Sequence, residues 1–256
     1  MSKQVKAKKH LGQHFLKDEN IAYKIVQALE TKDKEAILEI GPGMGVLTKY
    51  FVENKVNIKV AEIDTESVSY LKQHFPYLEN RIVEGDFLRK KRTDYFEEPI
   101  HLVGNFPYNI SSQIFFKVLE DKNNYLSVVC MLQKEVAERL ASPPGSKKYG
   151  ILSVLLQAFY SIEYLFTVHE HVFNPPPRVK SGVIRLTRNE VKELSCDEKL
   201  FFRLVKQGFN NRRKTLRNAL KSLNLPVEQI DEKYLKSRAE QLSVSEWLDL
   251  TSQVEG

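Results

Sequence analysis

The chain has 256 residues, of which 42% are hydrophobic and 28% are charged. This length allows a substantial core in one large or two modest domains, and the composition excludes a disordered chain. No apolar run approaches the roughly 20 residues of a membrane span, and no apolar segment follows the basic N-terminus as in a signal peptide. Cys130 and Cys196 are too few for a disulfide framework or a metal cluster. We therefore expect a cytoplasmic protein without a membrane segment or a metal site.

The net charge of +6 is unevenly distributed. Residues 1–17 contain five lysines (Lys3, Lys6, Lys8, Lys9 and Lys17) and no acid. Residues 201–222 also lack acids and contain Arg203, Lys206, Arg212, Arg213, Lys214, Arg217 and Lys221. Such segments attract polyanions such as nucleic acids, although a merely solvated basic face remains an alternative.

Short apolar runs alternate with helical stretches up to residue 187. The predicted strands span residues 36–40, 58–63, 81–83, 100–103, 126–132, 161–166 and 183–186. The predicted helices span residues 21–29, 47–54, 66–75, 111–119, 133–141 and 151–159. This alternation predicts an α/β fold with a mostly parallel sheet and helices on both faces.

The pattern changes after residue 187 and becomes entirely helical. Hydrophobic residues at helical spacing begin with Phe201, Leu204 and Val205, and Asn210–Asn211 can end that helix. Ser243 and Glu246 form a capping-box pattern before a last helix. We predict two domains, 1–188 and 189–256, of which the second is small and all-helical.

A glycine-rich turn follows the first predicted strand, with Gly41, Gly43 and Gly45 in G-x-G-x-G spacing. Glycines allow a sharp turn and a close approach of the backbone to a ligand at the carboxyl end of the sheet. The spacing differs from the dinucleotide pattern and favours a nucleoside whose linkage has no pyrophosphate. A plain strand-to-helix turn is the alternative.

Acidic residues stand at the end of the next predicted strand and after the one that follows it. Glu62, or Asp64 in its place, can accept hydrogen bonds from both ribose hydroxyls of a bound nucleoside. Asp86 can accept from an adenine amino group, and the ring of Phe87 can lie against the base. Taken singly, such acids are as compatible with helix caps or turns.

The segment after the fourth predicted strand is GNFPYN, residues 104–109. The N6 amino group of adenine is a poor nucleophile because its lone pair is delocalised into the ring. The side-chain oxygen of Asn105 and the carbonyl of Phe106 can accept its two hydrogens and favour a pyramidal nitrogen. Pro107 fixes the turn, and Tyr108 offers a stacking face for an unstacked base. These features predict methylation of adenine N6.

With these motifs in place, the sequence resembles the KsgA-type small-subunit rRNA adenine dimethyltransferases, which are related to the Erm rRNA methyltransferases. The resemblance extends from His10 to about Leu248. The matching strings are LGQHFL (11–16), EIGPG (39–43), GNFPYNIS (104–111), MLQKE (131–135), FNPPPRV (173–179) and FNNRRKTLR (209–217). It implies a Rossmann-like S-adenosylmethionine fold with a small helical C-terminal domain.

The resemblance also implies the substrate and the site. The substrate would be two adjacent adenosines in a hairpin loop near the 3′ end of 16S rRNA, each converted to N6,N6-dimethyladenosine. It places cofactor binding on His14, Leu16, Gly41, Glu62, Asp86 and Asn105, to which the glycine turn adds Gly43. The target adenine would lie against Asn105, Phe106, Pro107 and Tyr108, with Phe173 on its other face.

Two positions depart from the family pattern, in which Asn often stands at the position of His14 and Leu or Ile at that of Phe106. We expect a monomer that acts on rRNA within a pre-ribosomal 30S particle, with a role in ribosome biogenesis. We expect Arg212, Arg213, Lys214 and Arg217 to bind RNA phosphates. The alternatives are an Erm-type enzyme for large-subunit rRNA, a DNA adenine methyltransferase and a mainly non-catalytic assembly factor.

Overall fold

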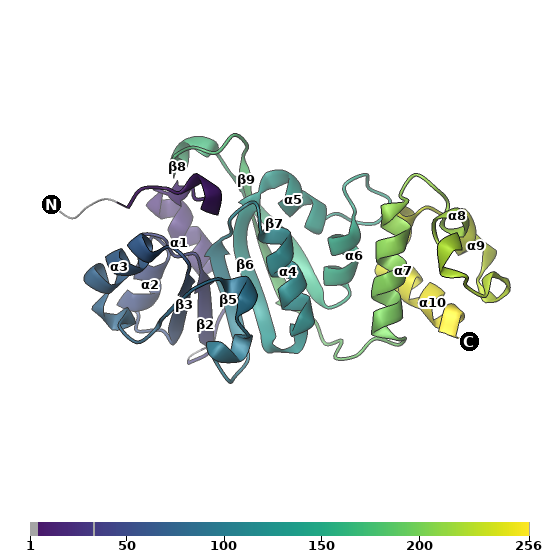
Figure 1. Cartoon of the computed structure of the whole chain (residues 1–256), viewed down its shortest axis with the longest axis horizontal. Helices are drawn as coiled ribbons and strands as arrows, with labels where there is room; N and C mark the ends of the chain where they lie inside the picture. The colour runs from purple at the N-terminus through teal and green to yellow at the C-terminus, as the bar shows by residue number, and fades with distance from the viewer. Residues whose placement is uncertain (1–4, 33, 256) are drawn as a thin grey trace. The chain divides into compact units, whose positions relative to one another are not determined.

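The computed structural model of the chain describes residues 5–32 and 34–255, so Lys3 of the predicted basic N-terminal segment lies outside the described residues. Within them, a seven-stranded sheet has the strand order β4-β3-β2-β5-β6-β9-β7 (Figure 1). The strands span Ile82–Glu84 (β4), Ile58–Glu62 (β3), Ala36–Ile40 (β2), Ile100–Asn105 (β5), Tyr125–Gln133 (β6), Ser181–Arg188 (β9) and Tyr160–Val168 (β7). Every predicted strand is present, and the predicted α/β fold is confirmed.

Strands β4, β3, β2, β5 and β6 are parallel, whereas β9 is antiparallel to β6. The strand order reverses between β2 and β5, the point at which open α/β sheets bind ligands. Here Ile40 pairs with Gly104, and a Cβ atom on Gly104 would approach the Ile40 carbonyl oxygen to 2.5 Å. The residues that follow β2, β3, β4 and β5 therefore meet at one edge of the sheet.

Helices cover both faces of the sheet because successive strand residues point to opposite sides. On one face, Ile37 and Val103 pack in a core with Ile25 of α1 (Glu19–Gln27), Phe51 of α2 (Thr48–Glu53) and Leu71 of α3 (Thr65–His74). Helix α4 (Ser111–Glu120) covers the other face of the sheet (Figure 1). It buries its apolar stripe, which includes Ile114, Phe115 and Val118.

A short antiparallel pair outside the main sheet was not predicted. It joins β1 (Phe15–Leu16) to β8 (Phe173–Asn174), with Leu16 opposite Phe173. Strands of two residues have no periodicity that a sequence pattern could reveal. This pair fastens the N-terminal segment beside the carboxyl edge of the sheet.

The chain divides into two compact units, and the second contains residues 138–161 in addition to those from 189 onward. The division differs from the predicted boundary at residue 188 because α6 (Ile151–Gln157) and its preceding loop pack with the C-terminal helices. The ring centroid of Tyr149, before α6, lies 6.2 Å from that of Phe209 in α7 (Glu198–Asn210). The backbone N–H of Gly145 also donates to the carbonyl of Glu240 over 2.6 Å.

The C-terminal part of this unit consists of α7, α8 (Leu216–Ala219), α9 (Glu232–Lys236) and α10 (Val244–Glu255), joined by short 3₁₀ turns. The buried stripe of α7 includes Phe201, Leu204 and Phe209, as the helical spacing predicts. The predicted capping box precedes α10, with Ser243 N–H donating to Glu246 Oε2 at 2.8 Å. None of the helices in the described part of the chain is long and apolar enough to cross a membrane.

Candidate active site

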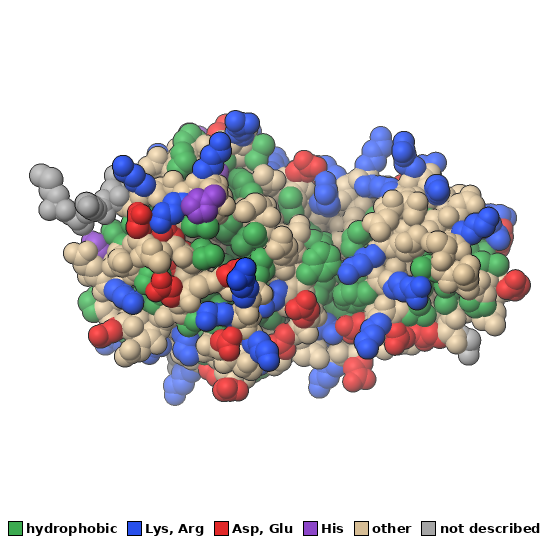
Figure 2. Space-filling view, viewed as in Figure 1, with side chains coloured by type: hydrophobic (Ala, Val, Ile, Leu, Met, Phe, Trp, Pro, Cys, Tyr) green, Lys and Arg blue, Asp and Glu red, His purple; other side chains and the backbone are tan. Residues whose placement is uncertain are grey.

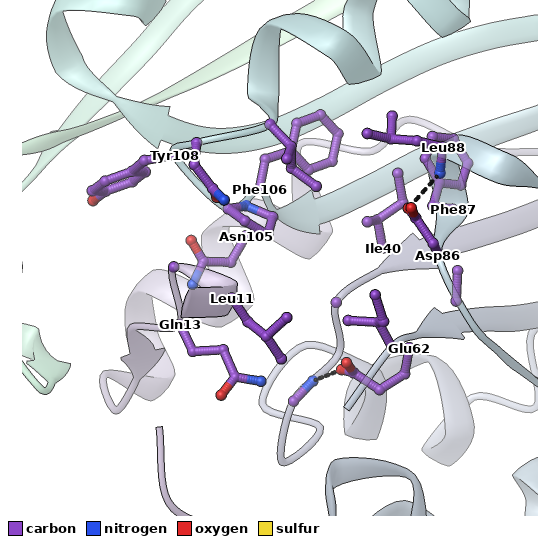
Figure 3. Close-up of a pocket in the computed structure, with 18 of the residues that line it drawn as sticks. Leu11, Gln13, Ile40, Glu62, Asp86, Phe87, Leu88, Asn105, Phe106 and Tyr108 are labelled. Carbon is purple, nitrogen blue, oxygen red and sulfur yellow. Dashed lines mark hydrogen bonds between the residues drawn. The ribbon is translucent and has the colours of Figure 1, made fainter. Parts of the chain in front are cut away.

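A cavity of about 300 Å³ lies at the carboxyl ends of β2, β3, β4 and β5 (Figure 3). Its glycine wall begins directly after β2, where Gly41 and Gly43 have positive φ angles of 64° and 56°. Other residues rarely adopt this conformation, and a Cβ atom on Gly43 would come within 2.8 Å of the Phe15 ring. The glycines therefore let the turn and the N-terminal segment close the cavity together.

Glu62 ends β3 and is buried at the cavity wall, with 3% of its surface exposed. Its Oε2 accepts from Gly43 N–H at 3.0 Å and its Oε1 from Asp64 N–H at 2.9 Å. Burial raises the pKa of Glu62. These backbone donors hold the carboxylate in one orientation, and each oxygen keeps a further lone pair for a ligand hydroxyl.

Asp64 has a structural role and does not line the cavity. Its side chain caps α3 by accepting from Glu66 N–H at 3.2 Å, and it accepts from Ser67 Oγ at 3.0 Å. It also forms an ion pair with Lys8 of the N-terminal segment. Of the two acids considered after this strand, only Glu62 is in a position to contact a ligand.

Asp86 follows β4 at the opposite wall, beside the buried ring of Phe87. One of its oxygens accepts from Leu88 N–H at 2.9 Å, and the other lies 3.5 Å from Arg89 Nε. Asp86 is thus a turn cap and a cavity residue at once. The sequence left open whether Asp86 is a turn residue or a ligand of an adenine amino group, and its position in the structure is compatible with both roles.

Asn105 ends β5 with its side-chain nitrogen donating to the carbonyl of His14 at 2.9 Å. Its Oδ1 accepts no hydrogen bond from the described residues, and the same is true of the carbonyl oxygen of Phe106. The Phe106 N–H is satisfied by the carbonyl of Met131 at 2.9 Å. Two acceptors from consecutive residues are therefore available at the cavity.

Tyr108 lines the cavity beside them, with its hydroxyl 2.6 Å from Ser181 Oγ at the start of β9. Burial raises the pKa of Tyr108, so the phenol stays neutral. The rings of Tyr108 and His14 lie 5.6 Å apart, and His14 Nδ1–H donates to the Pro175 carbonyl at 2.8 Å. The tyrosine ring is fixed by its surroundings and is not a free surface side chain.

The structure brings most of the predicted site residues to this cavity: His14, Gly41, Gly43, Glu62, Asp86, Asn105, Phe106, Pro107 and Tyr108. Leu16 lies in an adjoining cavity of about 40 Å³ with Glu39 and Asn105. Phe173 does not line either of these two cavities, since it pairs with Leu16 across β1–β8 and is 1% exposed in the core. The sequence analysis expected Phe173 on the face of the target adenine that is opposite Tyr108. The structure does not place Phe173 there.

Gln13 and Ile63 are among the cavity residues that were not predicted from the sequence. Ile63 directly follows Glu62 at the strand end and is 47% exposed, unusual for a large hydrophobic side chain. Its position next to the acid was a usable signal. No sequence pattern predicts that Gln13 lines the cavity, because its location depends on how the N-terminal segment folds back over the sheet.

Arg212, Arg213, Lys214 and Arg217 lie in the second unit, between α7 and α8 and in α8. Arg212 donates to the Lys147 carbonyl at 2.6 Å, and Arg217 forms an ion pair with Glu232. Arg213 and Lys214 are exposed, and their side chains bond no described residue. These two are the predicted RNA contacts most available to phosphates.

The cavity fits S-adenosylmethionine. Open space faces Gly41, and a buried carboxylate with spare lone pairs is available at Glu62. The apolar wall includes the buried Phe87 and the exposed Ile63. The described residues contain no cluster of His, Cys, Asp or Glu suited to a metal ion. Fold and site together define an S-adenosylmethionine-dependent methyltransferase with a Rossmann-like sheet.

The chain belongs to the ribosomal RNA adenine dimethylase family, whose model matches residues 4–255. It is 58% identical over 254 residues to a Cytophaga hutchinsonii protein named "Ribosomal RNA small subunit methyltransferase A", covering 98% of each chain. A Flavobacterium johnsoniae protein of the same name is 56% identical over 252 residues, covering 98% of this chain and 97% of the relative. The resemblance drawn from the motifs is confirmed: the protein is an S-adenosylmethionine-dependent rRNA methyltransferase.

Solved structures are similar over nearly the whole chain. A dimethyladenosine transferase from Plasmodium falciparum has a TM-score of 0.77 at 26% identity, covering 93% of this chain and 96% of that one. The 23S rRNA methyltransferase ErmE has a TM-score of 0.72 at 22% identity, covering 94% and 100%. The latter similarity concerns the fold alone.

Proposed function

We propose that this protein dimethylates N6 of two adjacent adenosines in a hairpin loop near the 3′ end of 16S rRNA. The observation that carries the proposal is the pair of available acceptors, Asn105 Oδ1 and the Phe106 carbonyl, beside the fixed ring of Tyr108. S-adenosylmethionine, when bound, supplies a methyl group already activated by its sulfonium sulfur. The protein then needs to position, desolvate and polarise the amino nitrogen.

Asn105 and Phe106 act together on the target amino group. Each acceptor would accept a hydrogen bond from one N6 hydrogen, which favours a pyramidal nitrogen whose lone pair is less conjugated with the ring and is directed towards the methyl donor. Because this geometry develops mainly in the transition state, the two oxygens accelerate transfer more than they tighten binding. Tyr108 stacks on the unstacked base and holds it in place.

The choice of the small-subunit substrate is supported by the names of the relatives, not by the shape of the fold. The two relatives at 56% and 58% identity carry a small-subunit name, whereas ErmE has a similar fold and a large-subunit name. The runner-up substrate is therefore adenine in large-subunit rRNA. The catalytic acceptors would be the same in both cases.

We further propose that the protein works as a cytoplasmic monomer on a pre-ribosomal 30S particle and contributes to its biogenesis. The exposed Arg213 and Lys214 support binding to rRNA phosphates by the second unit. A mainly non-catalytic assembly factor is the contrasting candidate. The available acceptor pair at the cavity favours catalysis over that role.

The test is incubation of the protein with radiolabelled S-adenosylmethionine and separated unmethylated ribosomal subunits, followed by mapping of the labelled nucleotide. The proposal expects dimethyladenosine at two adjacent loop positions of the small-subunit RNA. Label only in the large subunit would establish adenine in large-subunit rRNA as the substrate. Stable binding to small subunits without transfer would establish the assembly factor.

A further inference from the structure

Val179 exposes 46% of its surface on the loop between β8 and β9. The other large hydrophobic residues that are exposed in the described chain are Tyr23, Ile63 and Val191. The ring of Tyr23 packs edge-on to that of Tyr50, at 5.7 Å, and Ile63 lines the cofactor cavity. Val179 and Val191 have no such local explanation, and of these two only Val179 lies on a loop that contacts a residue of the cavity, since Ser181 at the end of that loop lies 2.6 Å from the hydroxyl of Tyr108.

The loop that carries Val179 is anchored to the wall that would hold the target base. At its start, the Pro175 carbonyl accepts from His14 at 2.8 Å. At its end, the fully buried Ser181 lies 2.6 Å from the hydroxyl of Tyr108. Prolines at 175, 176 and 177 fix the backbone φ angle at three consecutive positions. Val179 therefore lies on a restrained backbone, two residues before the serine that contacts Tyr108.

The charges around Val179 identify the class of ligand. No acid occurs from residue 171 to residue 189. Arg178 and Lys180 flank Val179, both are exposed, and in the described structure neither side chain forms a hydrogen bond or an ion pair. Figure 2 shows Lys and Arg side chains beside hydrophobic ones around β8. An apolar side chain between two available cations complements a base between two phosphates.

We propose that Val179 is an apolar wedge against the RNA base next to the target adenine, with Arg178 and Lys180 on the adjoining phosphates. Removing an adenine from its stack costs a few kcal/mol and exposes a face of its neighbour. Apolar side chains that cover such a face stabilise the unstacked state. The wedge rests on the proposed function, since it requires an RNA adenine as the substrate.

The test compares Val179→Asp, Val179→Ser and Val179→Leu with Val191→Asp, which places the same charge at an exposed valine outside the site. Single-turnover transfer to unmethylated small subunits is measured at saturating subunits and cofactor, and calorimetry of cofactor binding checks that each variant is folded. Stacking of a base on an aromatic side chain is worth about 1–3 kcal/mol, or roughly 5- to 150-fold, and the smaller aliphatic Val179 should contribute towards the lower end of this range. We expect Val179→Asp to lose rate in this range, Val179→Ser to lose less, and Val179→Leu and Val191→Asp to match the wild type.

Arg178→Glu and Lys180→Glu should weaken subunit binding, with the saturated rate nearly unchanged. The slope of the logarithm of affinity against the logarithm of salt concentration should flatten by about 0.7–0.9 for each phosphate that is no longer neutralised. A saturated rate of Val179→Asp within twofold of Val191→Asp would overturn the wedge. Weaker binding of Val179→Asp at an unchanged saturated rate would also overturn it, and would indicate a contact with a ribosomal protein instead.

The wild-type arm separates this inference from the proposed function. Transfer to large subunits alone would overturn the proposed substrate, and the same variants measured on that RNA would still decide the wedge. Absence of transfer to either subunit would overturn both.

Discussion

The side-chain nitrogen of Asn105 donates a hydrogen bond of 2.9 Å to the backbone carbonyl of His14. Because a carbonyl can only accept, this contact fixes which end of the Asn105 amide is the donor. The side-chain oxygen is left as the acceptor for a substrate. The N-terminal segment thus orients the group that we propose acts on N6, a coupling between residues 91 positions apart.

Glu62→Ala should weaken S-adenosylmethionine binding by roughly 10- to 150-fold, because hydrogen bonds to a charged group are worth about 1.5–3 kcal/mol. Affinity should also decline as the pH falls towards the raised pKa of Glu62, since protonation removes an acceptor. Isothermal calorimetry measures both effects. Glu84→Ala, an exposed acid at the end of β4, is the control and should bind normally. Equal affinities of the two folded variants would exclude Glu62 from the cofactor site.

Reversing the charges of Arg213 and Lys214 to Glu should weaken RNA binding and leave cofactor binding intact. The log–log slope of affinity against salt should flatten by about 0.7–0.9 for each phosphate that these side chains no longer neutralise. Filter binding of small subunits at several salt concentrations gives the slope. The matched control reverses Lys233 and Lys236, exposed cations of α9 outside the acid-free segment. If the slope flattens equally in both double variants, the segment is merely a solvated basic face.

His101 should make the protein acid-sensitive. Its Nδ1 lies 2.7 Å from Ser127 Oγ and its Nε2 2.9 Å from Glu35 Oε2, and burial lowers the pKa of His101. The unfolded chain therefore binds a proton at a higher pH than the folded chain does. The contribution of neutral His101 to the free energy of unfolding is fully present above about pH 6.5, and it is lost as the pH falls through the lowered pKa. His101→Gln should flatten the decline of the unfolding free energy below pH 6.5, measured by urea titration. The exposed His74→Gln should keep the wild-type decline, and two parallel curves would contradict the assignment.

Glu39 should make the folded protein less stable as the pH rises, whereas His101 makes it less stable as the pH falls. Burial raises its pKa to about 8, while Thr48 Oγ1 donates to its Oε2 at 2.7 Å. The folded state retains a proton that the unfolded state loses, so stability declines as the pH rises from the ordinary glutamate pKa of 4.5 to about 8. Glu39→Gln removes this decline, by up to about 1.4 kcal/mol per pH unit. Urea titrations between those limits should show the variant gaining on the wild type, whereas exposed Glu53→Gln should not. A constant difference between Glu39→Gln and the wild type would mean that Glu39 is ionised in the folded protein.

The sequence predicted the parts of the site that lie at strand ends, because a parallel sheet brings those ends together whatever the rest of the chain does. Gly41, Asp86 and Asn105 each follow a predicted strand, Glu62 lies at the carboxyl end of another, and all four line one cavity. The helical period of α7 likewise predicted which side of it is buried.

The parts that depend on long-range pairing were not predictable. The two-residue strands β1 and β8 have no pattern of their own, yet they bury Phe173 against Leu16 and close the N-terminal segment over the glycine turn. The assignment of residues 138–161 to the second unit depends on contacts such as Tyr149 with Phe209, which no local period encodes.

The central claim is that Asn105 accelerates methyl transfer by accepting from N6, and Asn105→Ala tests it. Loss of one preorganised polar group that acts in the transition state costs on the order of 100-fold or more in rate. The measurement is the single-turnover rate on unmethylated small subunits at saturating cofactor and subunits, with subunit affinity measured in parallel. The control is Asn54→Ala, which changes an exposed asparagine at the end of α2 that does not line the cavity. We predict a loss of about 100-fold or more in rate with subunit affinity within a few-fold of the wild type. A near wild-type rate for Asn105→Ala would contradict this mechanism.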